Sequence, residues 1–338
     1  MNRSVSLLLF LSFFGAACSP SKPDCARPDV FCVGFVTDAA GLQDYGLNQS
    51  AWLGIQRAQA DGLIQYAAYI ESNDSRDYAK NIVAFVQDGY DLIVTSGAGM
   101  RDDTLQAADL HPATVFMGLD QLPDPSRPNF TAMIFPEDYA GFLAGALAAL
   151  MTKTSRISAV CETSGIDSVW RTCDGFRAGA YYVDKKVKTS VNFRDSGSRD
   201  DLFNDPTWGQ DTALSMVRQG ADVIFGVGGG TGEGALQAAA EEQVYAIGSE
   251  QDQFYVTRET DLFLITSILP DASQGIYNAI PAIKNGQHPP KITGQIGMAP
   301  YHDLDPRVPD DVKKKIQEIY IDLLQGRILT GVSPERPK

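Results

Sequence analysis

Histidine is scarce in this sequence, and the short motifs of common catalytic sites are missing. There are three histidines in 338 residues, and each stands alone. The chain has no His-Glu-x-x-His, no Gly-x-Ser-x-Gly, no Cys-x-x-Cys and no phosphate-loop lysine motif. Zinc enzymes, serine hydrolases and nucleoside triphosphatases therefore lose support. We expect a protein that is not an enzyme and that holds neither a cofactor nor a metal.

Basic residues are also few compared with acidic ones. The chain has 28 lysines and arginines against 42 aspartates and glutamates, and its formal net charge is −14. Such a surface repels a phosphate backbone, so we expect no nucleic acid partner. An acidic surface fits an exported protein or a cationic ligand, and simple solubility explains it equally well.

The N-terminal apolar run is too short to span a membrane as a helix. It covers residues 5–14, against the ~20 residues that a spanning helix needs, and small residues then lead to Cys18. This pattern resembles a bacterial lipoprotein signal. We predict a signal peptide over 1–17, a lipidated Cys18 and a membrane tether over 18–30. Ordinary signal cleavage after Ala17 is the alternative.

Five cysteines are an odd number for an exported protein. If Cys18 carries lipid, four remain, and the most local of their three possible connectivities is Cys25–Cys32 with Cys161–Cys173. Neither spacing is a metal motif. Buried free thiols are the alternative, because Cys32 and Cys161 lie in apolar runs.

The two halves of the chain repeat one pattern. Asp91 and Asp222 each open an apolar run that ends in glycine, and the next apolar run of each half ends in an acid, Asp120 or Glu250. Strands that alternate with helical patterns predict parallel sheets built from βαβ units. We therefore predict an α/β fold of two doubly wound parallel-sheet lobes joined by a hinge.

The lobe boundaries follow from the same patterns. We place lobe I at 31–135 plus about 263–292, and lobe II at 136–262 plus about 293–338. The first crossing between the lobes is expected within 130–138.

Ligands of open α/β sheets sit at the carboxyl ends of the strands. The apolar run that starts at Phe31 ends in a polar loop that contains Asp38, Asp44 and Asn48. When two such domains face each other with these ends inward, their loops line one cleft. We predict the ligand site there.

A glycine-rich turn at 228–235 offers a competing interpretation. Gly230, Gly232 and Ala235 fit the Gly-x-Gly-x-x-Ala form of the dinucleotide fingerprint, and Glu250 ends the next strand where a ribose-binding acid belongs. Two points oppose it: export separates the protein from the cytoplasmic nicotinamide pool, and the fingerprint normally lies in the first βα turn of its domain. The glycines would still let backbone N–H groups approach a ligand, or they form a purely structural turn.

Several motifs together resemble the basic membrane protein (Bmp) family, the PnrA-like purine nucleoside-binding lipoproteins of bacterial ABC importers. The matching residues are Val36-Thr37-Asp38 with Asp44, Asn48 and Gln49, Tyr90-Asp91-Leu92-Ile93 with Gly97, Asp174-Gly175-Phe176-Arg177-Ala178-Gly179, Gly220-Ala221-Asp222-Val223-Ile224-Phe225, Gly229-Gly230-Thr231-Gly232, and Asp252-Gln253. They cover nearly the whole mature chain. The resemblance implies the fold of a type I periplasmic binding protein, which agrees with the repeat.

The resemblance also implies a set of ligand contacts. In this family one aromatic ring from each lobe sandwiches the purine, and acids at strand ends bind the base and the ribose. By position, the implied ligand-binding residues are Asp38, Asp44, Asn48, Gly97 and Asp120 in the first lobe and Phe203, Gly230, Glu250 and Asp252 in the second.

Three positions depart from the family pattern and leave the ligand open. Leu47 stands where the family has its first stacking phenylalanine, Glu250 stands where it has aspartate, and Pro270 stands where a ribose-binding lysine is expected. The aromatic residues that would replace the missing ring, or instead pack the interior, are Tyr45, Trp170 and Trp208.

The function expected from these observations is that of an extracytoplasmic substrate-binding lipoprotein of an ABC importer. It would be a monomer, anchored to a membrane by lipid, that carries a small molecule, expected to be a nucleoside, to a permease. A receptor for a membrane signalling protein and a dinucleotide-dependent oxidoreductase are the alternatives.

Overall fold

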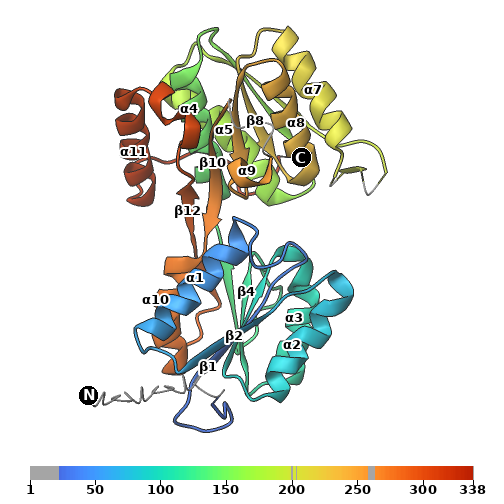
Figure 1. The fold of residues 1–338 in the computed structure, drawn as a ribbon, viewed down its shortest axis with the longest axis vertical. Coiled ribbons are helices and arrows are strands. Elements are labelled where there is room, and N and C mark those ends of the chain that lie inside the picture. Colours follow the sequence, from blue (N-terminus) through green and yellow to red (C-terminus); the bar gives the residue numbers. More distant parts are fainter. Residues whose placement is uncertain (1–22, 199–200, 203, 258–262, 338) are drawn as a thin grey trace, which may run out of the picture.

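The computed structural model describes residues 23–198, 201–202, 204–257 and 263–337. The predicted signal peptide, Cys18 and Phe203 lie outside these residues. Figure 1 shows two α/β lobes, one above the other, and this confirms the predicted fold class. Among the described residues, no helix has both the length and the apolar composition to cross a membrane.

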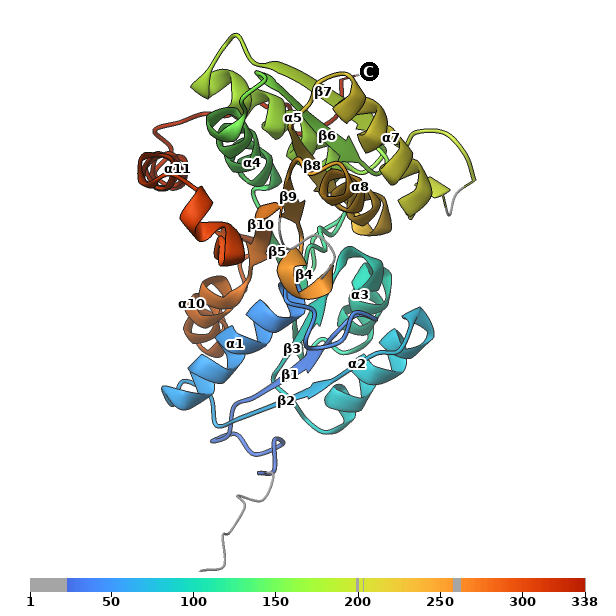
Figure 2. The same cartoon turned by 45° about the horizontal axis from the view of Figure 1, so that its top comes forward.

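The first lobe is built on a parallel six-stranded sheet in the order β11-β5-β4-β3-β1-β2. Its strands are β1 (Cys32–Val36), β2 (Tyr66–Ile70), β3 (Leu92–Ser96), β4 (Val115–Leu119), β5 (Phe130–Ile134) and β11 (Lys291–Thr293). Its helices are α1 (Leu47–Ala60), α2 (Tyr78–Gln87), α3 (Arg101–Leu110) and α10 (Ser273–Lys284). Figure 2 shows α1 and α10 on one face of this sheet and α2 and α3 on the other.

The second lobe repeats this arrangement in the order β12-β10-β9-β8-β6-β7. Its strands are β6 (Arg156–Cys161), β7 (Lys188–Phe193), β8 (Val223–Val227), β9 (Tyr245–Ser249), β10 (Leu264–Asp271) and β12 (Gln295–Met298), of which β12 runs antiparallel to β10. Its helices are α4 (Glu137–Met151), α5 (Asp167–Val183), α7 (Pro206–Arg218), α8 (Gly229–Glu241), α9 (Gln253–Val256) and α11 (Asp310–Leu324). Short 3₁₀ turns lie at Ser75–Asp77 and Ala98–Met100 in the first lobe and at His302–Arg307 in the second. The repeat seen in the sequence thus places β3 and β8, and also β4 and β9, at equivalent positions in the two sheets.

Buried apolar side chains stabilise the two sheets and the helices that cover them. β1, β3 and β8 are buried at every position, as expected for parallel strands covered by helices on both faces. One continuous apolar cluster packs under α1, α10, α4, α5 and α11 and joins the two lobes, while separate clusters lie under α2 and α3 and under α7 and α8.

Glycines allow α4 and α5 to approach closely. A Cβ added at Gly141 would lie 1.7 Å from the Thr172 carbonyl oxygen, and one at Gly145 would lie 1.9 Å from that of Phe176. No real side chain tolerates such distances. The pair therefore forms a rigid unit, and the N-terminal ends of both helices carry residues to the cleft described below.

Three short crossings join the lobes. The chain crosses after β5, between β10 and α10, and between β11 and β12. Gly294 lies in the third crossing, where its N–H donates to the Ile134 carbonyl oxygen at 2.8 Å and an added Cβ would meet the Phe135 ring at 2.3 Å. The first and third crossings are therefore side by side, as a hinge requires.

One predicted boundary needs correction. The sequence placed residues from about 263 in lobe I, but β10 pairs with β9 and β12 and so belongs to the second sheet. The chain returns to the first lobe only after Asp271. An apolar run cannot by itself reveal which of two like sheets it joins, because its composition suits both.

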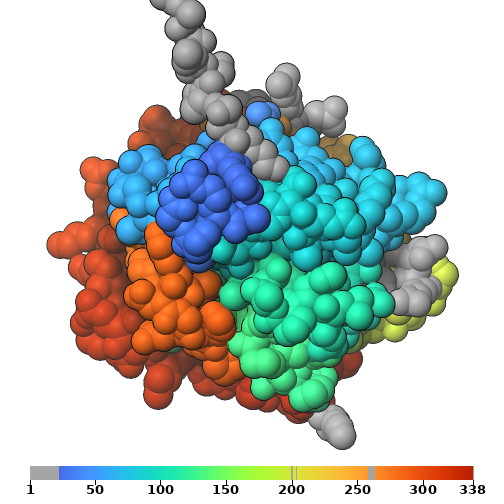
Figure 3. All heavy atoms as spheres, turned by 90° about the horizontal axis from the view of Figure 1, so that it is seen from below, coloured from blue at the N-terminus to red at the C-terminus, as the bar shows by residue number. Residues whose placement is uncertain are grey.

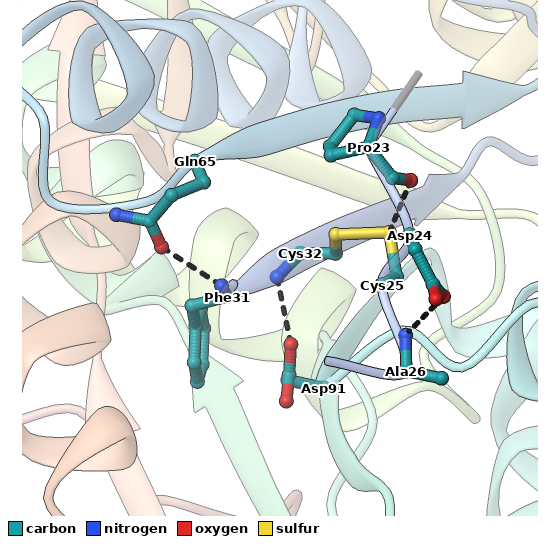
Figure 4. Close-up of a disulfide and its surroundings, with 8 residues drawn as sticks. All are labelled: Pro23, Asp24, Cys25, Ala26, Phe31, Cys32, Gln65 and Asp91. Carbon is teal, nitrogen blue, oxygen red and sulfur yellow. Dashed lines mark hydrogen bonds between the residues drawn. A yellow bond between two sulfur atoms is a disulfide. The ribbon is translucent and has the colours of Figure 1, made fainter. Parts of the chain in front are cut away.

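Both local cysteine pairs form disulfides, Cys25–Cys32 and Cys161–Cys173. Figure 4 shows the first at the start of β1, where the Phe31 N–H donates to Gln65 Oε1 at 2.8 Å and the Cys32 N–H donates to Asp91 Oδ2 at 2.7 Å. In Figure 3 the N-terminal segment (blue) lies on the far end of the first lobe, beside the orange segment that returns from the second. The chain before β1 is thus fastened at the end of the lobe opposite the strand ends that face the cleft.

Candidate functional site

A cavity of about 260 Å³ lies between the lobes, and residues from both line it. The lining residues are Asp38, Ala40, Asp44, Leu47, Asp120, Phe135, Glu137 and Ala140 near the first lobe and the first crossing, and Ser168, Val169, Thr172, Val227, Ser249, Glu250, Gln251, Ile268, Leu269, Pro270 and Ile296 from the second lobe. Many of them follow the carboxyl ends of strands, as predicted for a cleft between two facing sheets.

Asp38 is the acid at the end of β1, and its neighbours fix its position. Asn48 Nδ2 donates to Asp38 Oδ1 at 2.8 Å and also to the Gly41 carbonyl oxygen at 2.8 Å. Gly97, which has a φ of 88°, lies so close that an added Cβ would stand 3.1 Å from Asp38 Oδ2. Asn48 is buried and Gly97 is half-buried, and neither lines the cavity, so both support Asp38 from behind.

Asp44 holds the N-terminus of α1. Its carboxylate accepts hydrogen bonds from the backbone N–H groups of Gly46, Asn48 and Gln49 at 2.9, 2.9 and 3.0 Å. Burial raises the pKa of Asp44, and these hydrogen bonds oppose that effect. Asp44 therefore fixes the loop that places Leu47 on the cavity wall.

Asp120 belongs to a charged group that spans the first crossing. It follows β4 with a φ of 57°, and burial, together with the charges of Glu137 and Glu250, raises its pKa to about 7, while Arg171 opposes the rise. Arg171 Nη2 pairs with Glu137 Oε2 at 2.9 Å, and Arg171 Nη1 donates to the Pro334 carbonyl oxygen at 2.9 Å. The C-terminal segment thus helps to hold the arginine whose charge lowers the pKa of Asp120.

Two glutamates occupy the equivalent edge of the second sheet. Glu250 follows β9 with a φ of 67°, and Glu162 follows β6. Loss of hydration raises the pKa of Glu162 to about 8, and the nearby charge of Glu250 adds to the effect. The pKa of Glu250 is also raised, because protein from both lobes displaces water around its carboxyl, although the residue stays accessible through the cleft.

The glycine-rich turn after β8 opens α8, as predicted. The Gly229 N–H opposes the rise in the pKa of the Glu250 carboxyl. A Cβ added at Gly230 would lie 2.1 Å from Asn204 Oδ1, so this glycine allows close packing before α7. An added Cβ at Gly228 would likewise meet the Glu162 side chain, so close packing explains these glycines and favours the structural interpretation of the turn.

Tyr45 and Asp252 join the two lobes at the rim of the cleft. The Asp252 N–H donates to the Tyr45 carbonyl oxygen at 2.9 Å, and the Tyr45 ring stacks on Tyr255 with centroids 4.8 Å apart. The Asp252 side chain lies 2.9 Å from His302 Nε2 and accepts the Phe254 N–H at the start of α9. The structure therefore gives these residues a contact between lobes, and neither lines the cavity.

The two tryptophans do not replace the missing stacking ring. Trp170 stacks on Phe193 with centroids 5.8 Å apart, and Arg194 lies over the Trp208 ring at 5.7 Å. Neither tryptophan lines the cavity, whereas Leu47 and Pro270 do.

Sequence reasoning missed three charged residues, Glu137, Glu162 and Arg171. Glu137 opens α4 directly after the first crossing, and Glu162 directly follows a buried strand, so the rule used for Asp38 and Asp120 would have found both. Arg171 lies inside α5, where no local pattern marks it. Within the described residues, no group of three or more histidines, cysteines and acids is arranged to hold a metal ion.

Two like α/β lobes, three short crossings and a cavity that both lobes line define a two-lobed solute-binding protein. The chain belongs to the Bmp family, whose model, described as "ABC transporter substrate-binding protein PnrA-like", matches residues 31–296. This is a family of binding proteins rather than catalysts.

Known relatives agree with this placement. The chain is 29% identical over 271 residues to the ABC transporter nucleoside-binding protein BmpA of Lactococcus lactis, with 75% of each chain covered. It is 27% identical to basic membrane protein A of Borreliella burgdorferi, with 82% of this chain and 78% of that protein covered. A solved ABC transporter solute-binding protein from Conexibacter woesei has the same fold, with a TM-score of 0.70, 20% identity, and coverage of 89% of this chain and 98% of that one.

Proposed function

We propose that this protein is an extracytoplasmic receptor that binds a nucleoside between its lobes and delivers it to the permease of an ABC importer. The observation that carries the proposal is the cavity of about 260 Å³ whose walls combine strand-end acids of both lobes. Carboxylates are hydrogen-bond acceptors, so they suit the hydroxyl and amino groups of a nucleoside. The name of the Lactococcus relative supports the same ligand class.

Binding would be coupled to a hinge motion. A ligand that contacts both lobes binds the closed arrangement more tightly than the open one and shifts the population toward it. The contacts between Tyr45 and the segment 252–255 lie at the cleft rim, where they would form and break as the lobes move.

The proposal includes a lipid anchor at Cys18 and a monomeric receptor on the outer side of a membrane. The segment before β1 meets the first lobe at the end away from the cleft, so an anchor there would leave the cleft unobstructed. Replacing Cys18→Ser in the producing cell should move the protein from the membrane fraction to the soluble fraction. Retention in the membrane would refute the anchor.

Calorimetry with the purified full chain in detergent tests the ligand class. We expect saturable heat with at least one of adenosine, guanosine, inosine, uridine and cytidine, accompanied by an increase in thermal stability. Stabilisation by other small metabolites but by no nucleoside would overturn the nucleoside assignment and leave the receptor class in place.

A further inference from the structure

The cavity between the lobes carries charges of one sign. Its lining includes five carboxylates, Asp38, Asp44, Asp120, Glu137 and Glu250, and no described lining residue is a lysine, arginine or histidine. Glu162 lies close by, packed against Gly228, and its pKa responds to the charge of Glu250.

Some of these carboxylates are already compensated by the protein. Asp44 accepts three backbone N–H groups, Asp38 accepts the Asn48 amide and the Ala40 N–H, and Glu137 is paired with Arg171. Such partners oppose the rise that burial causes in the pKa of Asp44 and Glu137, so these acids depend less on a positive charge from a ligand.

Asp120, Glu162 and Glu250 are different. No ion pair joins any of them to a basic side chain among the described residues, and Arg171, whose charge reaches Asp120, is committed to Glu137. Burial raises the pKa of Glu250, and the Gly229 N–H opposes this rise. The second lobe therefore places the Glu250 carboxyl, which has no basic partner among the described residues, across the cleft from Asp120 of the first lobe.

The electrostatic consequence is that these groups attract protons. Burial is the main cause of the rise in the pKa of Asp120 to about 7, and the charges of Glu137 and Glu250 add to it while Arg171 opposes it. Burial likewise raises the pKa of Glu162 to about 8, with a contribution from the charge of Glu250, and it raises the pKa of Glu250, with a contribution from Glu233. Burial opposes ionisation without attracting a cation, whereas the neighbouring charges of Glu137 and Glu250 also attract any other positive charge that reaches Asp120.

Glu250 also stands where two cavities meet. A second cavity of about 200 Å³ lies under the glycine-rich turn, and it shares Ser249, Glu250 and Gln251 with the first. Its lining adds Glu233 and Gln253 and no basic residue among those described. A positive group beside Glu250 would therefore have room on both sides.

We propose that the cleft selects a ligand that carries a positive charge, held between Asp120 of the first lobe and Glu250 of the second. The inference rests on the proposed function in taking the ligand to be of nucleoside class. The ligand is then a nucleoside with a cationic base or a protonated amine, and neutral nucleosides are the weaker ligands.

Matched pairs of ligands test the charge separately from the shape. Binding of 1-methyladenosine, whose base is cationic, is compared by calorimetry with adenosine and with neutral N6-methyladenosine. Binding of 5′-amino-5′-deoxyadenosine is compared with adenosine and with 5′-deoxyadenosine. We expect at least one cation to bind at least about tenfold more tightly than both of its neutral counterparts, the effect of one charge-assisted hydrogen bond. Adenosine binding as tightly as both cations would overturn the charge inference and leave the nucleoside function intact.

Two variants test whether Asp120 and Glu250 bind the positive group of the ligand. Asp120→Asn and Glu250→Gln should each reduce the ratio of cation to neutral affinity, and asparagine tolerates the positive φ at position 120. Glu241→Gln, on the exposed side of α8, is the matched control and should leave the ratio unchanged. A ratio that neither cleft variant lowers would count against the proposal.

The pH dependence gives an independent check. The preference for the cation should rise between about pH 5.5 and about pH 7.5, because the pKa of Asp120, raised to about 7, leaves this acid mostly neutral at the lower pH and mostly ionised at the higher. A flat or opposite dependence would overturn the inference. Spermidine binding in the absence of any nucleoside binding would support a positively charged ligand and refute the nucleoside class. The absence of binding heat with both spermidine and the nucleosides would count against the charge inference and against the nucleoside assignment.

Discussion

Replacing Glu162→Gln should stabilise the protein at alkaline pH and leave it nearly unchanged at acidic pH. Loss of hydration raises the pKa of Glu162 from 4.5 to about 8, and the charge of Glu250 contributes. Glutamine keeps the shape of the side chain, which packs against Gly228, and removes the charge. The substitution therefore isolates the cost of ionising this one group.

The sign and size follow from proton linkage. Below the unfolded-state pKa of 4.5, both states hold the proton and Glu162 contributes nothing to the pH dependence. As the pH rises toward about 8, the unfolded chain ionises freely while the folded chain resists, so the free energy of unfolding falls. The full pKa difference corresponds to about 5 kcal/mol. Because the cleft is open to water, we discount this to about 2 kcal/mol.

Urea denaturation of the wild type and the variant at about pH 5 and about pH 8.5 measures the effect. We expect the variant to gain about 2 kcal/mol at the higher pH relative to the lower. Glu242→Gln, at an exposed position after α8, controls for the loss of a surface charge. Equal effects of Glu162→Gln at both pH values, or a loss of stability at the higher one, would refute the argument that the cleft opposes ionisation there.

Three further experiments with substituted variants test the site and its support. Leu47→Phe should tighten binding of purine nucleosides about threefold to tenfold in calorimetry, since an aromatic stack contributes ~0.5–1.5 kcal/mol beyond its buried area; unchanged or weaker binding would point to a ligand without a purine. Cys161→Ala/Cys173→Ala should lower the free energy of unfolding by about 2–4 kcal/mol in urea under oxidising conditions, and an unchanged value would mean that the bridge is not formed. Arg171→Met should lower the free energy of unfolding in urea by about 1–2 kcal/mol, because it leaves a half-buried Glu137 unpaired. Most of that loss should disappear in the double variant with Glu137→Gln. Strict additivity of the two single effects would exclude a direct pair.

Much of the architecture could be predicted because it repeats. The apolar runs that begin after Asp91 and Asp222 became β3 and β8, and the polar ends of strands placed Asp38, Asp120 and Glu250 on one cavity. These features depend on local periodicity and on the rule that ligands meet the carboxyl ends of parallel strands.

What could not be predicted depends on contacts between distant segments. Arg171 pairs with Glu137 because α4 and α5 pack closely through glycines, and the chain near Pro334 returns to hold the guanidinium. Tyr45 is an aromatic residue in the predicted ligand-binding loop, but its ring stacks on Tyr255 of the other lobe. A local pattern carries no information about such partners.

The duplication itself explains the charge of the cleft. Asp120 and Glu250 follow equivalent strands, β4 and β9, and both adopt a positive φ, at 57° and 67°. When the two lobes face each other, the same feature of each half is brought to the same cleft, so like charges meet and each raises the energy of the other's ionised form. Like charges oppose closure of an empty cleft, and the positive ligand group proposed above would remove that opposition. On that proposal, a chain built from two acidic halves would couple closure to the charge of its ligand, and this coupling would need no residue beyond the repeated strand-end acid.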